Sequence, residues 1–296
     1  MLRTFALAAA AMLLTVGATP APIDGTVPCV DQLMDIHGDP VGADLVIFAG
    51  GNQWFVMPEL LAAFQKAHPE VKHIFYETLP PGLLAQQIEN GALRIGEMTL
   101  SLHADVYLSG KKRMDVMREK GLVGAPVTYA TNELAIMVKA GNPKHITSLA
   151  DLGRSNVRVS MPNPKTEGIA RQIELAYKKA GGDALERTIM VTKVGNGSTR
   201  LTQIHHRQTP MWLLDGRADA GPVWLSEALY QERIHSGLAA VRIPAKDNVQ
   251  AIYLGATVKG APHADAAQAF VNFLATPTAE AIYRSYGFAS PKSTEE

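Results

Sequence analysis

The feature that most constrains the fold is a strand-loop-helix unit that recurs along the chain. Residues 44–49, DLVIFA, form a short apolar run that ends at two glycines, and apolar residues at helical spacing begin at Met57. Comparable units follow at residues 71–89 and 104–117. Because repeated units of this kind pair their strands in parallel through right-handed crossovers, the sequence predicts an α/β fold.

The same alternation restarts after Thr131. Strands are predicted at residues 134–138, 157–160 and 189–194, and a helix is predicted from Thr166 to Lys179. A long strand at 249–258 and an apolar helix at 264–274 close the pattern. Two runs of units predict two Rossmann-like lobes with mainly parallel sheets.

The lobe boundaries follow from where the pattern stops and restarts. The first lobe is predicted to contain residues 44–128 together with 248–288, and the second lobe residues 132–244. The chain then passes twice between the lobes, near residues 129–132 and 244–248, which predicts a two-crossing hinge.

Residues 1–21 have the pattern of a secretory signal peptide. Arg3 is followed by an apolar run over residues 5–16 and then by small residues suited to cleavage. That run is too short to span a bilayer. We therefore expect a cleaved, exported protein of a bacterial periplasm, and Thr26-Val27-Pro28 before the sole cysteine, Cys29, does not match a lipidation motif.

Charge and motif content exclude several classes of function. The chain has 28 basic and 28 acidic residues and no basic run, so a nucleic-acid partner is not expected. The sequence contains no Gly-x-Ser-x-Gly elbow, phosphate-binding loop or His-Glu-x-x-His helix. No enzymatic activity and no catalytic residue are therefore predicted.

The segment TQIHHRQTPMW, residues 202–212, concentrates groups that can bind a ligand. Thr209 before Pro210 is typical of a helix N-cap, and Arg207 beside a helix start could hold an anion with two parallel hydrogen bonds. Trp212 lies inside this helix and is predicted to pack in the core.

Three alternatives remain for the histidine pair. His205 and His206 could contact an anionic ligand, or they could join Glu77, with or without His103, in a nitrogen and oxygen set suited to zinc or iron. They could also only hydrogen-bond the backbone of a loop. Adjacent side chains in an extended segment point in opposite directions, which weighs against the metal alternative.

The chain also resembles a known family. The stretches LVIFAGG, PELLAAFQKAHPEV, LLAQQIENGA, ADVYLSG, TNELAIMV, ITSLADL, GRADAGPVW and AAQAFVNFLATPTAEAIYRSYGF are similar to those of two-lobed, class II periplasmic solute-binding proteins. Within that class the chain is most similar to the molybdate/tungstate-type binding proteins of ABC transporters. The resemblance implies a ligand held between two lobes that close on it.

The resemblance also implies a set of ligand-binding residues on the loops and helix starts that face the cleft. In the molybdate type, serine hydroxyls of the first two loops donate to the oxyanion, whereas these loops are GGNQW and ETLPPG here. Glu77 would then have to be protonated or paired, for example with Arg207. The expected ligand-binding residues are Asn52, Gln53, Trp54, Glu77, Thr78, Asn132, Thr166, Glu167, His205, His206, Arg207, Thr209 and Trp224.

The resemblance implies capture of a small anion, a molybdate-like oxyanion or a related species, and its delivery to an inner-membrane ABC permease. One alternative is a periplasmic protein that binds a metal ion or metal complex through His205, His206 and Glu77. Another is a subunit that presents its ligand to a membrane sensor. No cofactor is required under these interpretations, since a metal ion or oxyanion would be the bound ligand.

Overall fold

The computed structural model describes residues 23–26, 33–165, 167–203 and 205–291. The predicted signal peptide, Cys29 and Thr166 lie outside these residues. Within the described part, no helix is long and apolar enough to cross a membrane.

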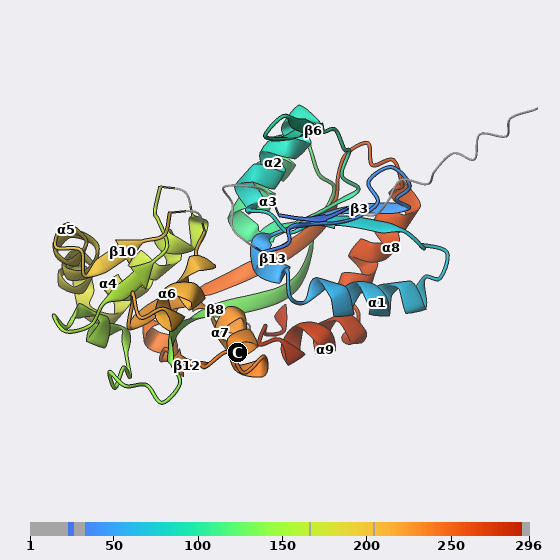
Figure 1. Ribbon diagram of the computed structural model, residues 1–296. Helices are drawn as coiled ribbons and strands as arrows, with labels where there is room; N and C mark the ends of the chain where they lie inside the picture. The colour runs from blue at the N-terminus through green and yellow to red at the C-terminus, as the bar shows by residue number, and fades with distance from the viewer. Residues whose placement is uncertain (1–22, 27–32, 166, 204, 292–296) are drawn as a thin grey trace, which may run out of the picture.

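The sheet of the first lobe has the strand order β1–β2–β4–β3–β7–β13–β8 (Figure 1). β3 pairs in parallel with β4 and β7, as the strand-loop-helix units predict, whereas β13 is antiparallel to β7 and β8. The strands are Ile23–Gly25 (β1), Ile36–Gly38 (β2), Leu45–Ala49 (β3), Ile74–Glu77 (β4), Val106–Gly110 (β7), Val127–Lys139 (β8) and Gln250–Thr257 (β13).

Helices cover both faces of this sheet, because β3 is buried along its whole length and needs apolar partners on each side. One core packs α1, α8 and α9 against the sheet, and a second core packs α2 and α3 against the opposite face (Figure 1). The helices are Met57–Ala67 (α1), Pro81–Asn90 (α2), Lys111–Glu119 (α3), Ala264–Leu274 (α8) and Pro277–Ser285 (α9).

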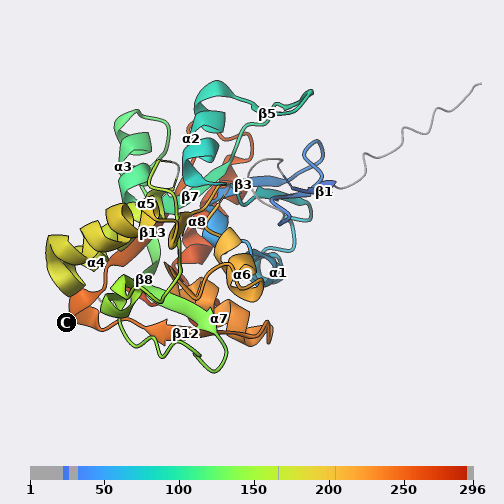
Figure 2. The same ribbon diagram turned by 60° about the vertical axis from the view of Figure 1, so that its left-hand side comes forward.

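The second lobe repeats this layered arrangement on a smaller sheet. β9 pairs in parallel with β10 and β11, and β8 is antiparallel to β11 and β12. One core lies under α4 and another under α6 and α7 (Figure 2). The elements are Val159–Met161 (β9), Gly168–Arg187 (α4), Lys193–Gly195 (α5), Thr199–Leu201 (β10), Gln208–Leu214 (α6), Ala220–Trp224 (β11), Leu225–Arg233 (α7) and Leu238–Arg242 (β12).

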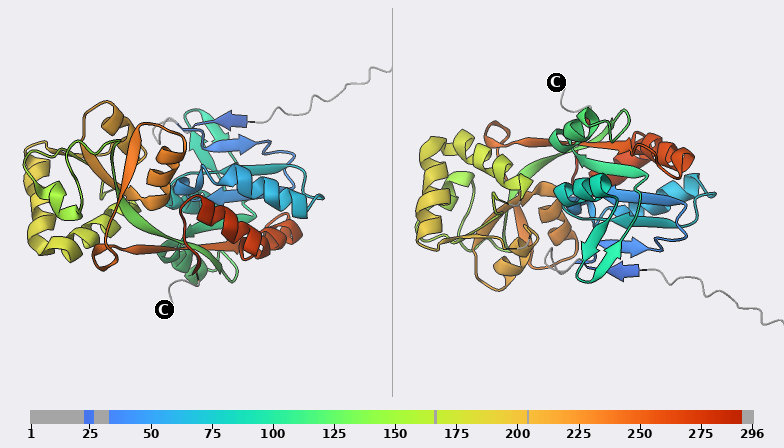
Figure 3. Two further views of the ribbon diagram at one scale, coloured as in Figure 1. Left: turned by 90° about the horizontal axis from the view of Figure 1, so that it is seen from below. Right: turned by 90° about the horizontal axis from the view of Figure 1, so that it is seen from above.

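The strand β8 belongs to both lobes. Its residues 127–133 pair with β13, and its residues 134–139 pair with β11 and β12. Figure 3 shows β8 and β13 running side by side between the two groups of elements. These two crossings are where a hinge is proposed, and the lobe boundaries given above remain predictions.

Two local predictions are wrong. Residues 189–194 are not a strand: Thr188–Thr192 is a π-helical turn that leads into α5. The helix α4 resumes after a kink at Gly181 and Gly182 and carries the chain helically through this β-branched run, because strand preference is weak against packing. Ile189 is buried there in the core of the second lobe.

The second error concerns the helix at Thr209. The helix α6 begins at Gln208 with Arg207 as its N-cap, so Thr209 lies inside the first turn. Its hydroxyl instead shares a hydrogen bond of 2.8 Å with the Ser160 hydroxyl. The tertiary contact has replaced the local cap.

Two antiparallel strand pairs were not predicted from the sequence. β1 and β2 form an antiparallel pair at the edge of the first sheet, where β2 joins β4. Leu93–Ile95 (β5) and Met98–Leu100 (β6) form a second pair. Strands of three residues carry too little alternation to be predicted.

Candidate functional site

The candidate site lies where loops of the first lobe meet the start of α6 in the second lobe. Gly51–Gln53 (η1) follows β3, and Thr78 follows β4, so both loops leave the carboxyl ends of neighbouring parallel strands. This is the edge at which α/β sheets place their ligands.

Arg207 joins the two lobes. Its Nη2 donates to Oδ1 of Asp35 at 2.9 Å and to the carbonyl oxygen of Thr78 at 3.2 Å. The side chains of Arg207 and Asp35 are 4% and 0% exposed, so the ion pair is shielded from solvent. A Cβ at Gly51 would lie 3.1 Å from Nη2 of Arg207, so glycine leaves the space that the guanidinium uses.

Asp35 reaches this position because β2 is added beside β4. The carbonyl oxygen of Asp35 accepts from the amide of Thr78 at 2.8 Å, directly before the pairing of Ile36 with Glu77. The edge strand β2 therefore places the Asp35 carboxylate beside the loop that follows β4.

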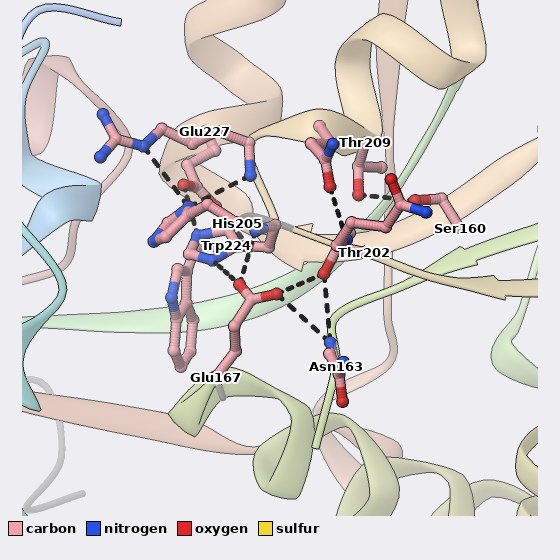
Figure 4. Close-up of polar contacts among 12 residues, drawn as sticks. Ser160, Asn163, Glu167, Thr202, His205, Thr209, Trp224 and Glu227 are labelled. Carbon is pink, nitrogen blue, oxygen red and sulfur yellow. Dashed lines mark hydrogen bonds and ion pairs between the residues drawn. The ribbon is translucent and has the colours of Figure 1, made fainter. Parts of the chain in front are cut away.

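His206 lies between two buried carboxylates of the second lobe. Its Nδ1 is 2.7 Å from Oε2 of Glu167, and its Nε2 is 2.8 Å from Oε1 of Glu227 (Figure 4). Burial opposes the charged imidazole, but the neighbouring carboxylates of Glu227 and Glu167 raise the pKa of His206 to about 10. We therefore treat this group as an imidazolium held by two carboxylates.

His205 packs its ring against His206, with 4.0 Å between ring centroids. Its Nδ1 accepts from the backbone amide and from Nε of Arg207, at 3.3 Å and 3.4 Å. Burial, His206 and Arg207 hold the pKa of His205 well below its usual value. His205 is therefore a neutral imidazole.

Glu167 is fixed by a dense set of donors. Its Oε2 accepts from the amide of His206 at 2.5 Å, and its Oε1 accepts from the amide of Asn163 at 3.2 Å and from the hydroxyl of Thr202 (Figure 4). Burial raises the pKa of Glu167, but His206 and Thr202 outweigh it and lower the pKa. Glu167 is also the N-cap residue of α4.

Two asparagines connect the site to the hinge strands. Nδ2 of Asn52 donates to the Tyr253 hydroxyl at 2.6 Å, and Nδ2 of Asn132 donates to the Ser226 hydroxyl at 2.8 Å. Asn132 lies on β8 and Tyr253 on β13. The site is therefore in hydrogen-bond contact with both crossing strands.

The structure brings together many of the candidate residues predicted from the sequence. Asn52 and Thr78 come from the first lobe, Asn132 from the hinge strand, and the others from the second lobe. Those of the second lobe are Glu167, His205, His206, Arg207 and Trp224.

Other predicted residues point elsewhere. Oε1 of Gln53 accepts from the Tyr283 hydroxyl at 2.8 Å, inside the first lobe. Trp54 packs against Tyr230 with 5.0 Å between ring centroids. Thr209 faces Ser160, as described above. Trp54 also lines a cavity beside the site.

The expected pairing of Glu77 with Arg207 is not what the structure shows. Oε1 of Glu77 accepts from Nε2 of Gln87 at 2.9 Å, and the residue is fully buried. Burial raises the pKa of Glu77 to about 7, with a contribution from the carboxylate of Asp35. Arg207 takes Asp35 as its partner because β2 carries that residue to the guanidinium.

The proposed metal set also changes in composition. Among the described residues, one ligand atom each from Glu167, His205 and His206 lie within 4.8 Å of one another. Glu77 is not in this group, because its side chain turns toward α2. The two imidazoles contact each other rather than pointing apart, because residues 205–207 form a turn and not an extended strand.

Sequence reasoning missed Asp35, Ser226, Glu227 and Tyr253. Glu227 could have been found, because it follows Trp224 by three residues and accepts from the Trp224 amide at 3.2 Å, as in a capping box. Asp35 had no such signal, since the short strand β2 that positions it was not predicted.

A cavity of about 390 Å³ adjoins the site on one side. His206, Arg207 and Glu227 form its polar end. The rest of its wall is mainly apolar, and it includes Trp54, Phe55, Met137, Pro210, Met211, Leu214, Val223, Tyr230 and Ile234.

Comparisons with known proteins identify the family and the fold. Residues 45–289 match the family described as bacterial extracellular solute-binding protein. The molybdate-binding protein ModA of Mycobacterium tuberculosis (strain ATCC 25618 / H37Rv) is 28% identical over 254 residues, which are 83% of this chain and 85% of that protein.

Solved structures share the fold. The sulfate-binding protein SubI from Mycobacterium tuberculosis H37Rv superposes with a TM-score of 0.65 at 22% identity, over 83% of this chain and 86% of that chain. The periplasmic molybdate-binding protein of Azotobacter vinelandii gives a TM-score of 0.64 at 17% identity, over 83% and 99% of the two chains.

Proposed function

The chain belongs to the family of bacterial extracellular solute-binding proteins, and from that premise we propose that it captures a small oxyanion between its two lobes. The candidate ligands are the tetrahedral anions that its relatives are named for, molybdate and sulfate, and anions of similar chemistry. The proposed role is capture and delivery, with no catalytic step.

The observation that carries this proposal is the position of Arg207. A guanidinium from the second lobe is buried against the loops that follow β3 and β4 in the first lobe. Guanidinium groups bind oxyanions through several N–H donors in a fixed plane. An anion bound there would contact both lobes at once, which is the condition for closure on a ligand.

The first lobe supplies a further donor to the same place. The hydroxyl of Thr78 is buried and has no hydrogen-bond partner among the described residues, while the carbonyl oxygen of Thr78 already contacts Arg207. A buried hydroxyl in that condition is costly unless a ligand completes its bonding. The Thr78 hydroxyl would therefore donate to the oxyanion, as serine hydroxyls do in the molybdate type.

Asp35 supports the assignment in a different way. Its carboxylate is itself an oxyanion, carried on a side chain, and it is bound by the same guanidinium in the structure. We propose that a diffusible oxyanion competes with Asp35 for Arg207. Only an anion that binds Arg207 more tightly than Asp35 does would then be captured.

The test is a thermal-shift and calorimetric screen of purified protein with molybdate, tungstate, sulfate, thiosulfate and phosphate. At least one anion should bind with a stoichiometry of one, and Arg207→Gln should abolish the binding. Arg158→Gln is the matched control, because Arg158 pairs with Asp219 in the second lobe at a half-exposed position. Binding that survives in the Arg207 variant would refute the proposal.

The proposed partner is an inner-membrane ABC permease that accepts the loaded, closed protein. The supporting facts are the family membership and the two-lobed fold. Stimulation of ATP hydrolysis by the reconstituted permease should require both this protein and its anion, and Arg207→Gln should fail to stimulate.

A further inference from the structure

A second group of polar side chains lies beside Arg207 but is not needed to hold an oxyanion. Glu167, His205 and His206 are all buried and place one possible ligand atom each within 4.8 Å of one another. The three residues come from the N-cap of α4 and from the turn before α6, so two distant segments converge on one point.

The donor set has a specific chemistry. One carboxylate oxygen and two imidazole nitrogens suit zinc and other divalent transition metals, while magnesium and calcium prefer oxygen ligands alone. Three protein ligands leave at least one coordination position open, which is the pattern of sites that accept an external ligand.

The surroundings resemble the supporting shell of a metal site. Nε2 of His206 lies 2.8 Å from Glu227, and metal-ligating histidines commonly hold a carboxylate on their second nitrogen. The Oε1 atom of Glu167 is oriented by the amide of Asn163 and the hydroxyl of Thr202, which leaves Oε2 directed at Nδ1 of His206 (Figure 4).

The buried carboxylates at this point favour a bound cation. Two of them, Glu167 and Glu227, lie 2.7 Å and 2.8 Å from the ring nitrogens of His206. Arg207 and Asp35 balance each other and contribute no net charge. A divalent cation at this point would offset the charge of both carboxylates, and buried uncompensated charge is costly.

We propose that Glu167, His205 and His206 bind one divalent transition-metal cation, with Glu227 orienting His206. The site stands beside the guanidinium of Arg207 and is independent of it for binding the metal. The cavity that His206 and Glu227 line adjoins this site.

The experiment uses tag-free, full-length mature protein that has been stripped with a chelator. Calorimetric titration with Zn²⁺, and separately with Ni²⁺ and Mn²⁺, should give one bound ion per chain for zinc or nickel. Native mass spectrometry of the loaded protein should show the corresponding single mass increment.

Two variants remove a ligand atom and keep part of the hydrogen bonding around it. His205→Asn keeps an acceptor near the amide of Arg207, and Glu167→Gln keeps an acceptor for Thr202. Each should weaken zinc binding by about 100-fold or more, and Glu227→Gln should weaken it by about 10- to 100-fold. The matched control is His263→Asn, because His263 also contacts a buried carboxylate, Asp105, but lies in the first lobe.

The proposal would be overturned if the wild type bound fewer than about 0.1 zinc ions and fewer than about 0.1 nickel ions per chain, which is a tenth of one site. Unchanged metal binding in both ligand variants would also overturn it. Circular dichroism confirms that each variant is folded. The anion screen is repeated on chelator-stripped protein, so that loss of anion binding and loss of metal binding are scored separately.

Discussion

Asp35→Asn is the substitution that most sharply separates the proposed roles of the interlobe ion pair. It removes one charge from a pair 2.9 Å apart whose side chains are 4% and 0% exposed. Removing one partner of a buried ion pair costs about 3–5 kcal/mol, because the remaining charge keeps its desolvation penalty. Asparagine can still accept from Arg207, so we expect the lower end, about 3 kcal/mol.

That cost translates into measurable shifts. In a protein of this size, about 3 kcal/mol lowers the Tm by roughly 6–12 °C. The exposed pair Lys111–Asp115, whose side chains are 55% and 40% exposed, provides the control. Asp115→Asn should change the free energy of unfolding by about 0.5 kcal/mol or less, because solvent screens such a pair.

Asp35→Asn should increase the affinity for the anion, although it lowers the stability of the fold. In the wild type it must displace a carboxylate from Arg207, whereas in Asp35→Asn it meets the guanidinium without that competitor. If displacing Asp35 from Arg207 costs the anion about 1.4 kcal/mol or more of binding free energy, the variant should bind the anion at least tenfold more tightly. Urea denaturation and calorimetry measure the two effects. Unchanged stability, or weaker anion binding in Asp35→Asn, would refute the reasoning.

Three further outcomes follow from the same geometry. Gly51→Ala places a Cβ 3.1 Å from both Nη2 of Arg207 and the carbonyl oxygen of Thr78, so calorimetry should show anion affinity reduced about tenfold or more, with Gly195→Ala, which meets no neighbouring atom, as the control. Arg207→Lys keeps the charge but loses the planar fork, so anion affinity should fall while the lobes stay folded. Burial, with help from the Asp35 carboxylate, raises the pKa of Glu77 from 4.5 to about 7, so the folded state retains a proton that the unfolded chain releases. Stability from this group is therefore complete below pH 4.5 and is lost as pH rises through about 7, by about 3 kcal/mol. Glu77→Gln should flatten that part of a urea-denaturation pH profile, and an unaltered profile would contradict the assignment.

The sequence predicted the elements whose apolar pattern is long. The helix α8 has the predicted bounds, residues 264–274. The parallel pairing of β3 with β4 and β7 follows from the same pattern. These features are local or periodic, so a single sequence contains them.

The site was predictable only in part, because its geometry depends on short or irregular segments. The turn that brings the His205 ring against the His206 ring has no periodic signal, and neither does the edge strand that brings Asp35 to Arg207. Glu77 looked available from the sequence, yet its side chain turns toward Gln87. A carboxylate's partner is decided by tertiary packing, which residue order does not reveal.

The most direct test of the central claim is the position of the bound anion itself. Crystals grown with the tightest-binding oxyanion would be measured at the absorption edge of its central atom, so that an anomalous difference map locates it. The account predicts one peak between the lobes, with its oxygens in hydrogen-bond contact with the guanidinium of Arg207 and the hydroxyl of Thr78. A peak only on the outer surface of either lobe, or an ordered anion that does not contact Arg207, would contradict it.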